Sequence, residues 1–284
     1  MAMVREPDDT FSGEVELATP SARSMLLATL TLHVVPDGGS TWTGALIESL
    51  GLLGVNDKAC RQAIQRLVAD GWIVTERHGR HARLYLTPLA HGHMQRDQHI
   101  ARFEAATSPR QWVVLLLMLD KEHRENRRRL RRSLVSFGWG NVSPGAWLNT
   151  GSASQEAAIE VLKREGLDGS ATFLRADFIN PSSVKGLIDR TWDLSALASR
   201  YVAFLDRFQA VRPRTDETAF VARAQLTDMW MRSFRADPFL PAEHLPAQWP
   251  GTPARELLND RMVRWAPAAD RWWKSAVGRA QPGR

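Results

Sequence analysis

Arginine and glutamine side chains that could contact DNA bases gather in one short stretch of this 284-residue chain. Arginine can make two parallel hydrogen bonds to guanine, and glutamine can make two to adenine, at the base edges of the major groove. The first group consists of one lysine, two arginines and two glutamines: Lys58, Arg61, Gln62, Gln65 and Arg66. A second, basic group follows closely: Arg77, Arg80, His81 and Arg83. The two groups predict contacts with double-stranded DNA.

The spacing of residues 58–70 predicts an amphipathic helix that would present the first group to solvent. Its apolar side consists of Cys60, Ile64, Leu67 and Val68, and the five polar side chains fall on the opposite side of the helical period. Asn56 or Asp57 can cap the start of this helix, and Gly71 can end it. The alternative interpretation is an ordinary surface helix whose polar face meets only water.

A basic hairpin is predicted directly after this helix, with strands at residues 72–77 and 83–87 and a turn at 78–81. Gly79 permits the turn. Four apolar residues are expected to cover the helices: Trp72, Val74, Leu84 and Leu86. The basic group would then point outward, where Arg80 could reach a phosphate or a minor groove. A helix followed by a basic hairpin is the layout of a winged helix-turn-helix, which places the helix in the major groove.

Two further helices, predicted at residues 21–35 and 41–53, complete this unit. Each has apolar residues at helical spacing. The sequence thus predicts a winged helix-turn-helix DNA-binding domain at residues 21–88. Residues 1–20 are expected to form a disordered tail, because they are charged and polar and their apolar residues do not recur at helical or strand spacing. Residues 89–107 predict a connector helix.

The middle of the chain alternates strands and helices. The pattern predicts strands and helices at residues 112–119, 122–137, 146–149, 155–164 and 171–178, with room for one further strand. The apolar run at the start is typical of a central strand covered on both faces. This order predicts a small ferredoxin-like α+β domain at residues 108–180.

The first helix of this middle domain contains six arginines: Arg124, Arg127, Arg128, Arg129, Arg131 and Arg132. Leu130, Leu134 and Phe137 form its buried side. A second DNA contact is one interpretation of the arginine run. A solvated face, or a partner for acidic groups or phosphates elsewhere in the protein, is the interpretation that the sequence favours.

Strand patterns stop after residue 181, where amphipathic helices are predicted at residues 194–211, 217–236 and 253–265. Residues 181–284 therefore predict a helical C-terminal domain. The expected fold class is α+β multidomain, with an N-terminal winged helix-turn-helix, a ferredoxin-like middle domain and an all-α C-terminal domain.

The sequence contains no convincing catalytic or metal-binding set. Cys60 is the single cysteine, which excludes an intrachain disulfide, and its place on the inner side of a helix predicts a buried structural thiol. His91 and His93 diverge on a helix, and with His99 they have no carboxylate or thiol partner at a suitable spacing. We expect no catalysis, no metal and no cofactor.

The charge and the apolar runs bear on partners and location. The net charge of +6 favours a polyanionic partner. The first twenty residues have no apolar signal segment, and the run at 113–119 is far shorter than the roughly 20 residues of a membrane helix. We expect a cytoplasmic protein with no membrane partner.

Several motifs together carry a family resemblance. They are Trp42 through Gly71-Trp72, with Arg61 and Arg66-Leu67-Val68; Arg77, Gly79-Arg80 and Leu86-Thr87; Trp112, Arg131-Arg132-Ser133-Leu134 and Phe137-Gly138-Trp139-Gly140; and Pro144-Gly145-Ala146-Trp147. The most specific is Asp237-Pro238-Phe239-Leu240-Pro241 through Leu245-Pro246-Ala247-Gln248-Trp249-Pro250-Gly251. Over roughly residues 21–265, the chain resembles the PaaX family of bacterial transcriptional regulators, whose founding members repress phenylacetate catabolism.

This resemblance implies a sequence-specific repressor of a catabolic operon. It implies a homodimer on a two-fold operator, formed through the ferredoxin-like domain. It also implies release by a small-molecule effector, an aryl-CoA thioester such as phenylacetyl-CoA. No stretch of the sequence is recognisable as an effector-binding site.

Two alternatives belong to other functional classes. The middle domain resembles, more faintly, the small ferredoxin-like nuclease of CRISPR spacer acquisition, in which a carboxylate after the first strand can hold a metal. Asp120 stands at that place, although a helix cap is its simpler role. The other alternative is an architectural or RNA-binding protein, against which the lack of an aromatic RNA-binding strand counts.

Overall fold

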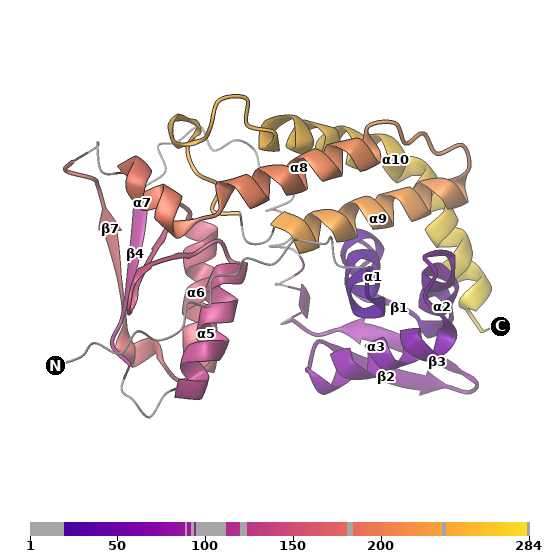
Figure 1. Cartoon of the computed structure of the whole chain (residues 1–284). Helices are drawn as coiled ribbons and strands as arrows, with labels where there is room; N and C mark the ends of the chain where they lie inside the picture. The colour runs from indigo at the N-terminus through magenta and orange to yellow at the C-terminus, as the bar shows by residue number, and fades with distance from the viewer. Residues whose placement is uncertain are drawn as a thin grey trace.

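A computed structural model of the chain describes residues 20–88, 90–91, 94, 112–119, 124–180, 184–234 and 237–282. In Figure 1 the N-terminal elements form one body and the middle sheet forms another, with long C-terminal helices running between them. The predictions for residues 1–19, for most of the connector, for His93 and His99, and for Asp120 lie outside the described residues.

The N-terminal body begins with α1, Ala22–Thr29, which continues as a short π-helix, Leu30–Val34. Ser21 starts it with a capping box, because its hydroxyl accepts from the Ser24 amide and the Ser24 hydroxyl accepts from the Ser21 amide. This confirms the first predicted helix. The strand β1, Ser40–Trp42, then precedes α2, Thr43–Leu52. Three residues are too few to show a strand period, so the sequence did not predict β1.

The third helix and the hairpin stand where the sequence placed them. The helix α3 spans Asp57–Ala69, and the strands β2, Ile73–His78, and β3, His81–Leu86, follow it. Strand β3 lies between β1 and β2 in an antiparallel sheet. One detail is wrong: Val74, predicted to cover the helices, is 55% exposed, whereas Ile73 is buried. The pairing with β3 explains this, because Ile73 lies opposite Leu86 on the face of the buried Leu84, whereas Val74 lies opposite Tyr85 on the other face.

The middle body is a four-stranded antiparallel sheet with the order β5-β6-β4-β7. In chain order its elements are β4, Trp112–Leu117; α5, Arg124–Ser136; β5, Gly140–Ser143; β6, Ala146–Asn149; α6, Ser152–Arg164; a 3₁₀ turn, Asp168–Ser170; and β7, Ala171–Ala176. This βαββαβ order is that of a ferredoxin-like fold, as predicted. The strand β5 is the further strand that the pattern left room for.

Both faces of the middle sheet are covered. Helices α5 and α6 pack on one face around Leu115, Leu130 and Trp147. The other face, which includes Trp112, is covered by α7, Val184–Thr191, through Val184 and Ile188. Helix α7 was not predicted, because eight residues after a proline are too few to show a clear helical period.

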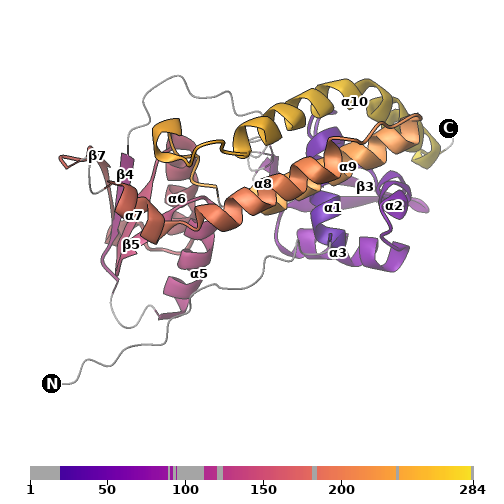
Figure 2. The ribbon, with the colours of Figure 1, turned by 45° about the horizontal axis from the view of Figure 1, so that its top comes forward.

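The remaining elements are α8, Leu194–Phe208; α9, Asp216–Phe234; a 3₁₀ turn, Ala242–His244; and α10, Gly251–Ala280. Figure 2 shows α8 to α10 crossing from the middle body to the N-terminal body. The predicted end of the last helix near residue 265 is wrong, because α10 continues through Pro267. A proline inside a helix removes one hydrogen bond, and the residues after it are held by packing against the N-terminal body.

That packing joins the first and last elements in one core. Phe220 of α9 and Ala269 and Trp273 of α10 belong to the same buried cluster as Leu26 of α1 and Leu46 of α2. At its edge, the Arg279 guanidinium forms an ion pair with Glu48 at 2.5 Å. The C-terminal helices therefore close the core on which α3 rests.

A buried histidine lies at the centre of this contact. The ring of His33 stacks between Phe220 and Trp273, with ring centroids 5.3 Å apart in each pair. Its Nδ1 lies 3.2 Å from Oδ1 of Asp270, which also accepts from Arg223 at 2.9 Å. Burial, the largest influence, lowers the pKa of His33 below its ordinary value, against the opposing influence of Asp270. His33 is therefore neutral near pH 7, and Nδ1–H donates a hydrogen bond to the Asp270 carboxylate.

Candidate nucleic-acid interface

The helix α3 presents all five predicted polar side chains to solvent. Its buried side consists of Cys60, Ala63, Ile64 and Leu67. Lys58, Arg61, Gln62, Gln65 and Arg66 are exposed on the opposite side. The Asn56 side chain caps the helix by accepting from the Ala59 amide at 2.8 Å. Val68, expected on the inner side, is 40% exposed at the edge of the polar face.

One of these side chains already has an acidic neighbour. Nε of Arg61 lies 2.8 Å from Oδ1 of Asp57, one helical turn earlier, and both side chains are more than half exposed. Water screens such an exposed pair, so it contributes little to stability and is easily exchanged for a base or a phosphate. Arg66 has no ion pair within the described ranges. The helix can therefore offer two arginines and two glutamines to a groove.

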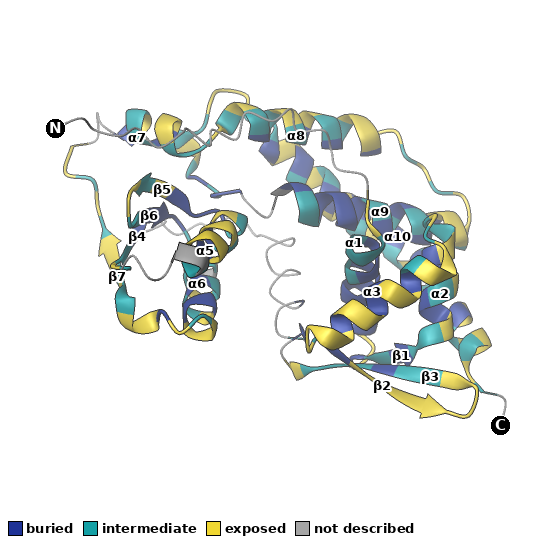
Figure 3. Ribbon diagram, turned by 60° about the horizontal axis from the view of Figure 1, so that its bottom comes forward, coloured by how far each residue is buried: buried dark blue, intermediate teal, exposed yellow. Residues whose placement is uncertain are grey.

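The hairpin presents most of its basic group as predicted. Arg77, Arg80 and His81 are exposed, and Gly79 has a φ of +62° at the turn, which glycine adopts without strain. In Figure 3 the exposed face of α3 and the hairpin of β2 and β3 lie side by side on the same face of the molecule. The structure thus brings the two predicted groups together on one basic surface.

Arg83 has a different place from the one predicted. It is half-buried, and its guanidinium donates to the Ser40 hydroxyl at 3.0 Å. The same guanidinium lies 5.6 Å from the ring centroid of Trp42 and 5.5 Å from that of Tyr85. Arg83 therefore fastens β1 to the hairpin, a role that the sequence could not show because β1 was not predicted.

Cys60 lies beneath the polar face of α3 and is fully buried. Burial, with a further contribution from Asp57, raises the pKa of its thiol to about 11. A thiol with such a pKa stays protonated near pH 7 and is a poor nucleophile. This confirms the structural role expected for Cys60.

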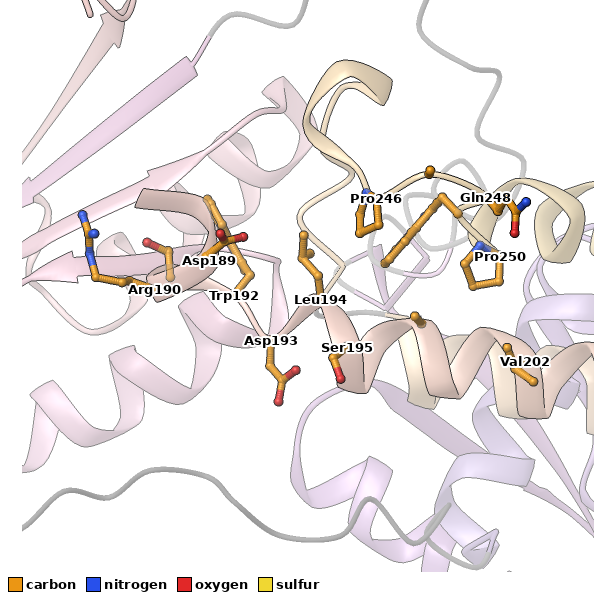
Figure 4. Close-up of a pocket in the computed structure, with 14 residues that line it drawn as sticks. Asp189, Arg190, Trp192, Asp193, Leu194, Ser195, Val202, Pro246, Gln248 and Pro250 are labelled. Carbon is orange, nitrogen blue, oxygen red and sulfur yellow. The ribbon is translucent and has the colours of Figure 1, made fainter. Parts of the chain in front are cut away.

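A cavity of about 860 Å³ lies between the end of α7, the start of α8 and the loop before α10 (Figure 4). Its apolar wall includes Trp192, Leu194, Pro246, Trp249 and Pro250. Two carboxylates on its lining already have partners: Asp189 pairs with Lys185, and Asp193 accepts from the Ala196 amide. This size and lining suit a small molecule with a flat apolar group.

The loop that lines this cavity is held in an uncommon conformation. Gln248 has a φ of +59°, a region that side chains other than glycine rarely adopt. The Trp249 ring packs edge to face on the buried Tyr201 at 5.8 Å. On the opposite wall, Nε1 of Trp192 donates to the Gly138 carbonyl of the middle body at 3.2 Å. The cavity thus lies between the middle body and the start of α10.

The described residues contain neither a cluster that could hold a metal ion nor a helix that could span a membrane. Within them, no three His, Cys, Asp or Glu side chains are grouped closely enough to hold a metal ion. None of the helices drawn in Figure 1 is both long and apolar enough to span a membrane, as far as the described residues extend.

Comparisons with known proteins place most of the chain in one family. Residues 21–88 match the PaaX-like protein family, residues 105–188 the PaaX protein central Cas2-like domain, and residues 192–275 the PaaX-like protein C-terminal domain. The transcriptional repressor PaaX of Escherichia coli strain K12 is 27% identical over 276 residues, which cover 92% of this chain and 86% of that protein.

A solved structure supports the fold. The uncharacterized protein Rv0674 from Mycobacterium tuberculosis has a TM-score of 0.55 at 22% sequence identity, over 91% of this chain and 99% of that one. At this identity the likeness concerns the fold alone. The family follows from the three consecutive matches and the similar repressor: this chain belongs to the PaaX family.

Proposed function

We propose that this protein is a DNA-binding transcriptional repressor. The observation that carries the proposal is the surface on which α3 presents Arg61, Gln62, Gln65 and Arg66 beside the basic hairpin. Arginine and glutamine on one exposed helix face are the side chains that discriminate bases in the major groove. The similarity to a transcriptional repressor over 92% of the chain supports the same conclusion. It also favours a regulator over an enzyme, and no observation favours the nuclease alternative.

In this proposal residues 21–88 are a winged helix-turn-helix, with the hairpin as its wing. The ferredoxin-like domain at residues 108–180 pairs two copies, and the helical domain at residues 181–284 holds the DNA-binding domain in place. A homodimer would set two α3 helices in successive major grooves of a two-fold operator, about 34 Å apart. Correct spacing between the two helices would then be a condition for repression.

The effector is proposed to enter the cavity beside Trp192 and Trp249. The apolar wall suits the aryl part of an aryl-CoA thioester such as phenylacetyl-CoA. A ligand between these two tryptophans would press the loop before α10 away from the middle body. Because α10 closes the core beneath α3, its displacement would change the spacing of the two α3 helices. Such a ligand shifts the equilibrium only if it binds the displaced state more tightly.

Replacing both Arg61 and Gln65 by alanine tests the DNA surface. A bidentate contact to a base contributes about 1–3 kcal/mol of discrimination, so we expect affinity for the operator to fall by one to four orders of magnitude, roughly. The measurement is a fluorescence-anisotropy titration of a duplex selected by the wild-type protein from a random pool. Circular dichroism should show an unchanged fold, because neither side chain is buried.

The matched control for this variant is Arg264→Ala. Arg264 is an exposed arginine that pairs with Asp260 one turn earlier, just as Arg61 pairs with Asp57. It lies on α10, outside the proposed DNA-binding domain at residues 21–88. The control removes the same charge and the same kind of ion pair, and its affinity should match the wild type. Equal affinities of the control and the double variant would exclude α3 as the base-reading element.

Filling the cavity tests the effector site. Val202 lines the cavity from α8 and is 47% exposed, so Val202→Tyr adds a ring there without removing a core contact. We expect this variant to bind operator like the wild type but to stay bound when phenylacetyl-CoA is added. Val263→Tyr is the control, because Val263 is an exposed apolar residue that does not line the cavity. Release of Val202→Tyr at the wild-type effector concentration would rule this cavity out.

A further inference from the structure

Helix α5 of the middle domain carries a second concentration of positive charge. Its exposed arginines are Arg127, Arg128, Arg129, Arg131 and Arg132. Leu130 and Leu134 are the buried residues on the opposite side. At 100° per residue, Arg128, Arg131 and Arg132 lie within about 100° of one another on one side of the helix. They form one basic stripe, named here the α5 stripe.

Within the described residues, the α5 stripe has no acidic partner. Among the described residues, no carboxylate lies within ion-pair distance of Arg128, Arg131 or Arg132, whereas several other exposed arginines have one. Exposed arginines with such partners are Arg61, Arg264, Arg271 and Arg279, and the half-buried Arg23 also has one. Like the stripe, Arg66, Arg77 and Arg80 of the proposed DNA surface are without ion pairs in the described ranges. Of the two interpretations favoured from the sequence, the solvated face agrees with the exposure of these arginines, and an acidic partner is not found among the described residues.

Helix α5 also lies on the appropriate side of the molecule. In Figure 1 the lower end of α5 reaches the level of α3 and the hairpin. Figure 3, which brings this underside forward, shows exposed residues of both α5 and α3 toward the viewer. A duplex placed against α3 would extend along the face on which α5 lies.

We propose that the α5 stripe binds the phosphate backbone of the same DNA, beside the base pairs that α3 contacts. The inference rests on the proposed function and extends it to a second contact from the middle domain. From Arg128 to Arg132 the helix rises about 6 Å. One DNA strand places a phosphate about every 3.4 Å along the axis, so the stripe spans roughly two successive phosphates. Arginine binds phosphate oxygens in bidentate fashion, without regard to sequence.

A second copy of this chain is not the partner of the stripe. Two copies meeting through this face would bring arginines against arginines, and the repulsion of like charges opposes such a contact. The polyphosphate of a coenzyme is the other source of the same chemistry. It is small and needs no alignment of the stripe with α3, so only DNA accounts for the shared face of the two elements.

The test compares two duplexes and two variants. The operator sequence selected by the wild-type protein is made with and without flanks of about ten base pairs, one helical turn, on each side. The variant Arg128→Gln/Arg131→Gln/Arg132→Gln removes the stripe. The control Arg175→Gln/Arg207→Gln/Arg214→Gln removes three exposed arginines that line neither the α5 stripe nor the cavity, and it changes the net charge equally. Affinity is measured between about 50 and 200 mM salt, where counterion release governs the slope.

Each lost phosphate contact reduces the slope of log affinity against log salt by about 0.9. Because each stripe spans two phosphates, we expect the slope of the stripe variant on the flanked duplex to be shallower than that of the wild type by about 1.8 for each bound protomer. The slope of the control variant should be unchanged. On the short duplex the wild type, the stripe variant and the control variant should all have the same slope. The inference would be overturned if the stripe variant and the wild type had equal slopes on the flanked duplex. It would also be overturned if the slope of the stripe variant decreased by the same amount on both duplexes.

Two further outcomes separate this inference from the proposed function. If the stripe variant binds both duplexes like the wild type but no longer responds to phenylacetyl-CoA, the stripe holds coenzyme phosphates and the DNA contact is refuted. If the Arg61 and Gln65 double variant loses binding while the stripe variant does not, the repressor proposal stands and the inference alone fails. If the wild-type protein selects no sequence, both fail.

Discussion

Replacing Trp273 by alanine is expected to abolish operator binding although Trp273 lies in none of the predicted DNA contacts. The side chain is 2% exposed, stacks on His33, and donates from Nε1 to Asp37 at 3.3 Å. Removing a buried tryptophan costs about 3–5 kcal/mol, through lost burial and the cavity that remains. The substitution would destabilise the core that α1, α2 and α10 share, and this core supports α3. Urea unfolding followed by circular dichroism measures the loss, and anisotropy measures DNA binding.

Val263→Ala is the control for that prediction. Val263 lies on the same helix but is 76% exposed, so its replacement should change neither stability nor DNA binding by a measurable amount. A Trp273→Ala protein with wild-type stability would show that α10 does not close this core. A destabilised protein that still binds operator with wild-type affinity would show that α3 is held without α10.

The candidate DNA surface could be predicted from sequence because its information is local. In α3 the cap at Asn56, the period of buried residues and the end at Gly71 all lie within 16 consecutive residues. Those residues fix which side chains face outward, whatever packs behind them. The same reasoning succeeded for the apolar strand β4, whose continuous run indicated cover on both faces.

The features that the sequence did not reveal depend on contacts between distant segments. Arg83 looked like an outward wing residue, yet its place is set by Ser40 and Trp42, more than 40 residues earlier. The last helix looked complete before Pro267, yet α10 continues because Trp273 fits against His33. A local period carries no information on which surface a helix will meet, so such contacts required the structure.

The buried pair of His33 and Asp270 has a consequence for acid stability. Folding lowers the pKa of His33, chiefly because burial removes water from the ring and also because Arg223 is near, although Asp270 opposes this shift. The folded protein therefore keeps His33 neutral at a pH where the unfolded chain, with a pKa near 6.5, already binds a proton. Because the unfolded state binds more protons, the free energy of unfolding must decrease as the pH falls below about 6.5.

We therefore expect stability to decline between about pH 7 and pH 5, with a slope of up to about 1.4 kcal/mol per pH unit from this one group. His33→Phe keeps an aromatic ring between Phe220 and Trp273 and removes the titrating group, while Asp270 retains its pair with Arg223. Urea unfolding at several pH values should show a steep decline for the wild type and a shallower one for the variant. Asp270, whose own pKa is lowered first by the hydrogen bond from His33 and also by Arg223, loses its contribution only as the pH falls through the acid range below its ordinary value. A decline of equal slope in both proteins would assign the acid sensitivity to groups other than His33.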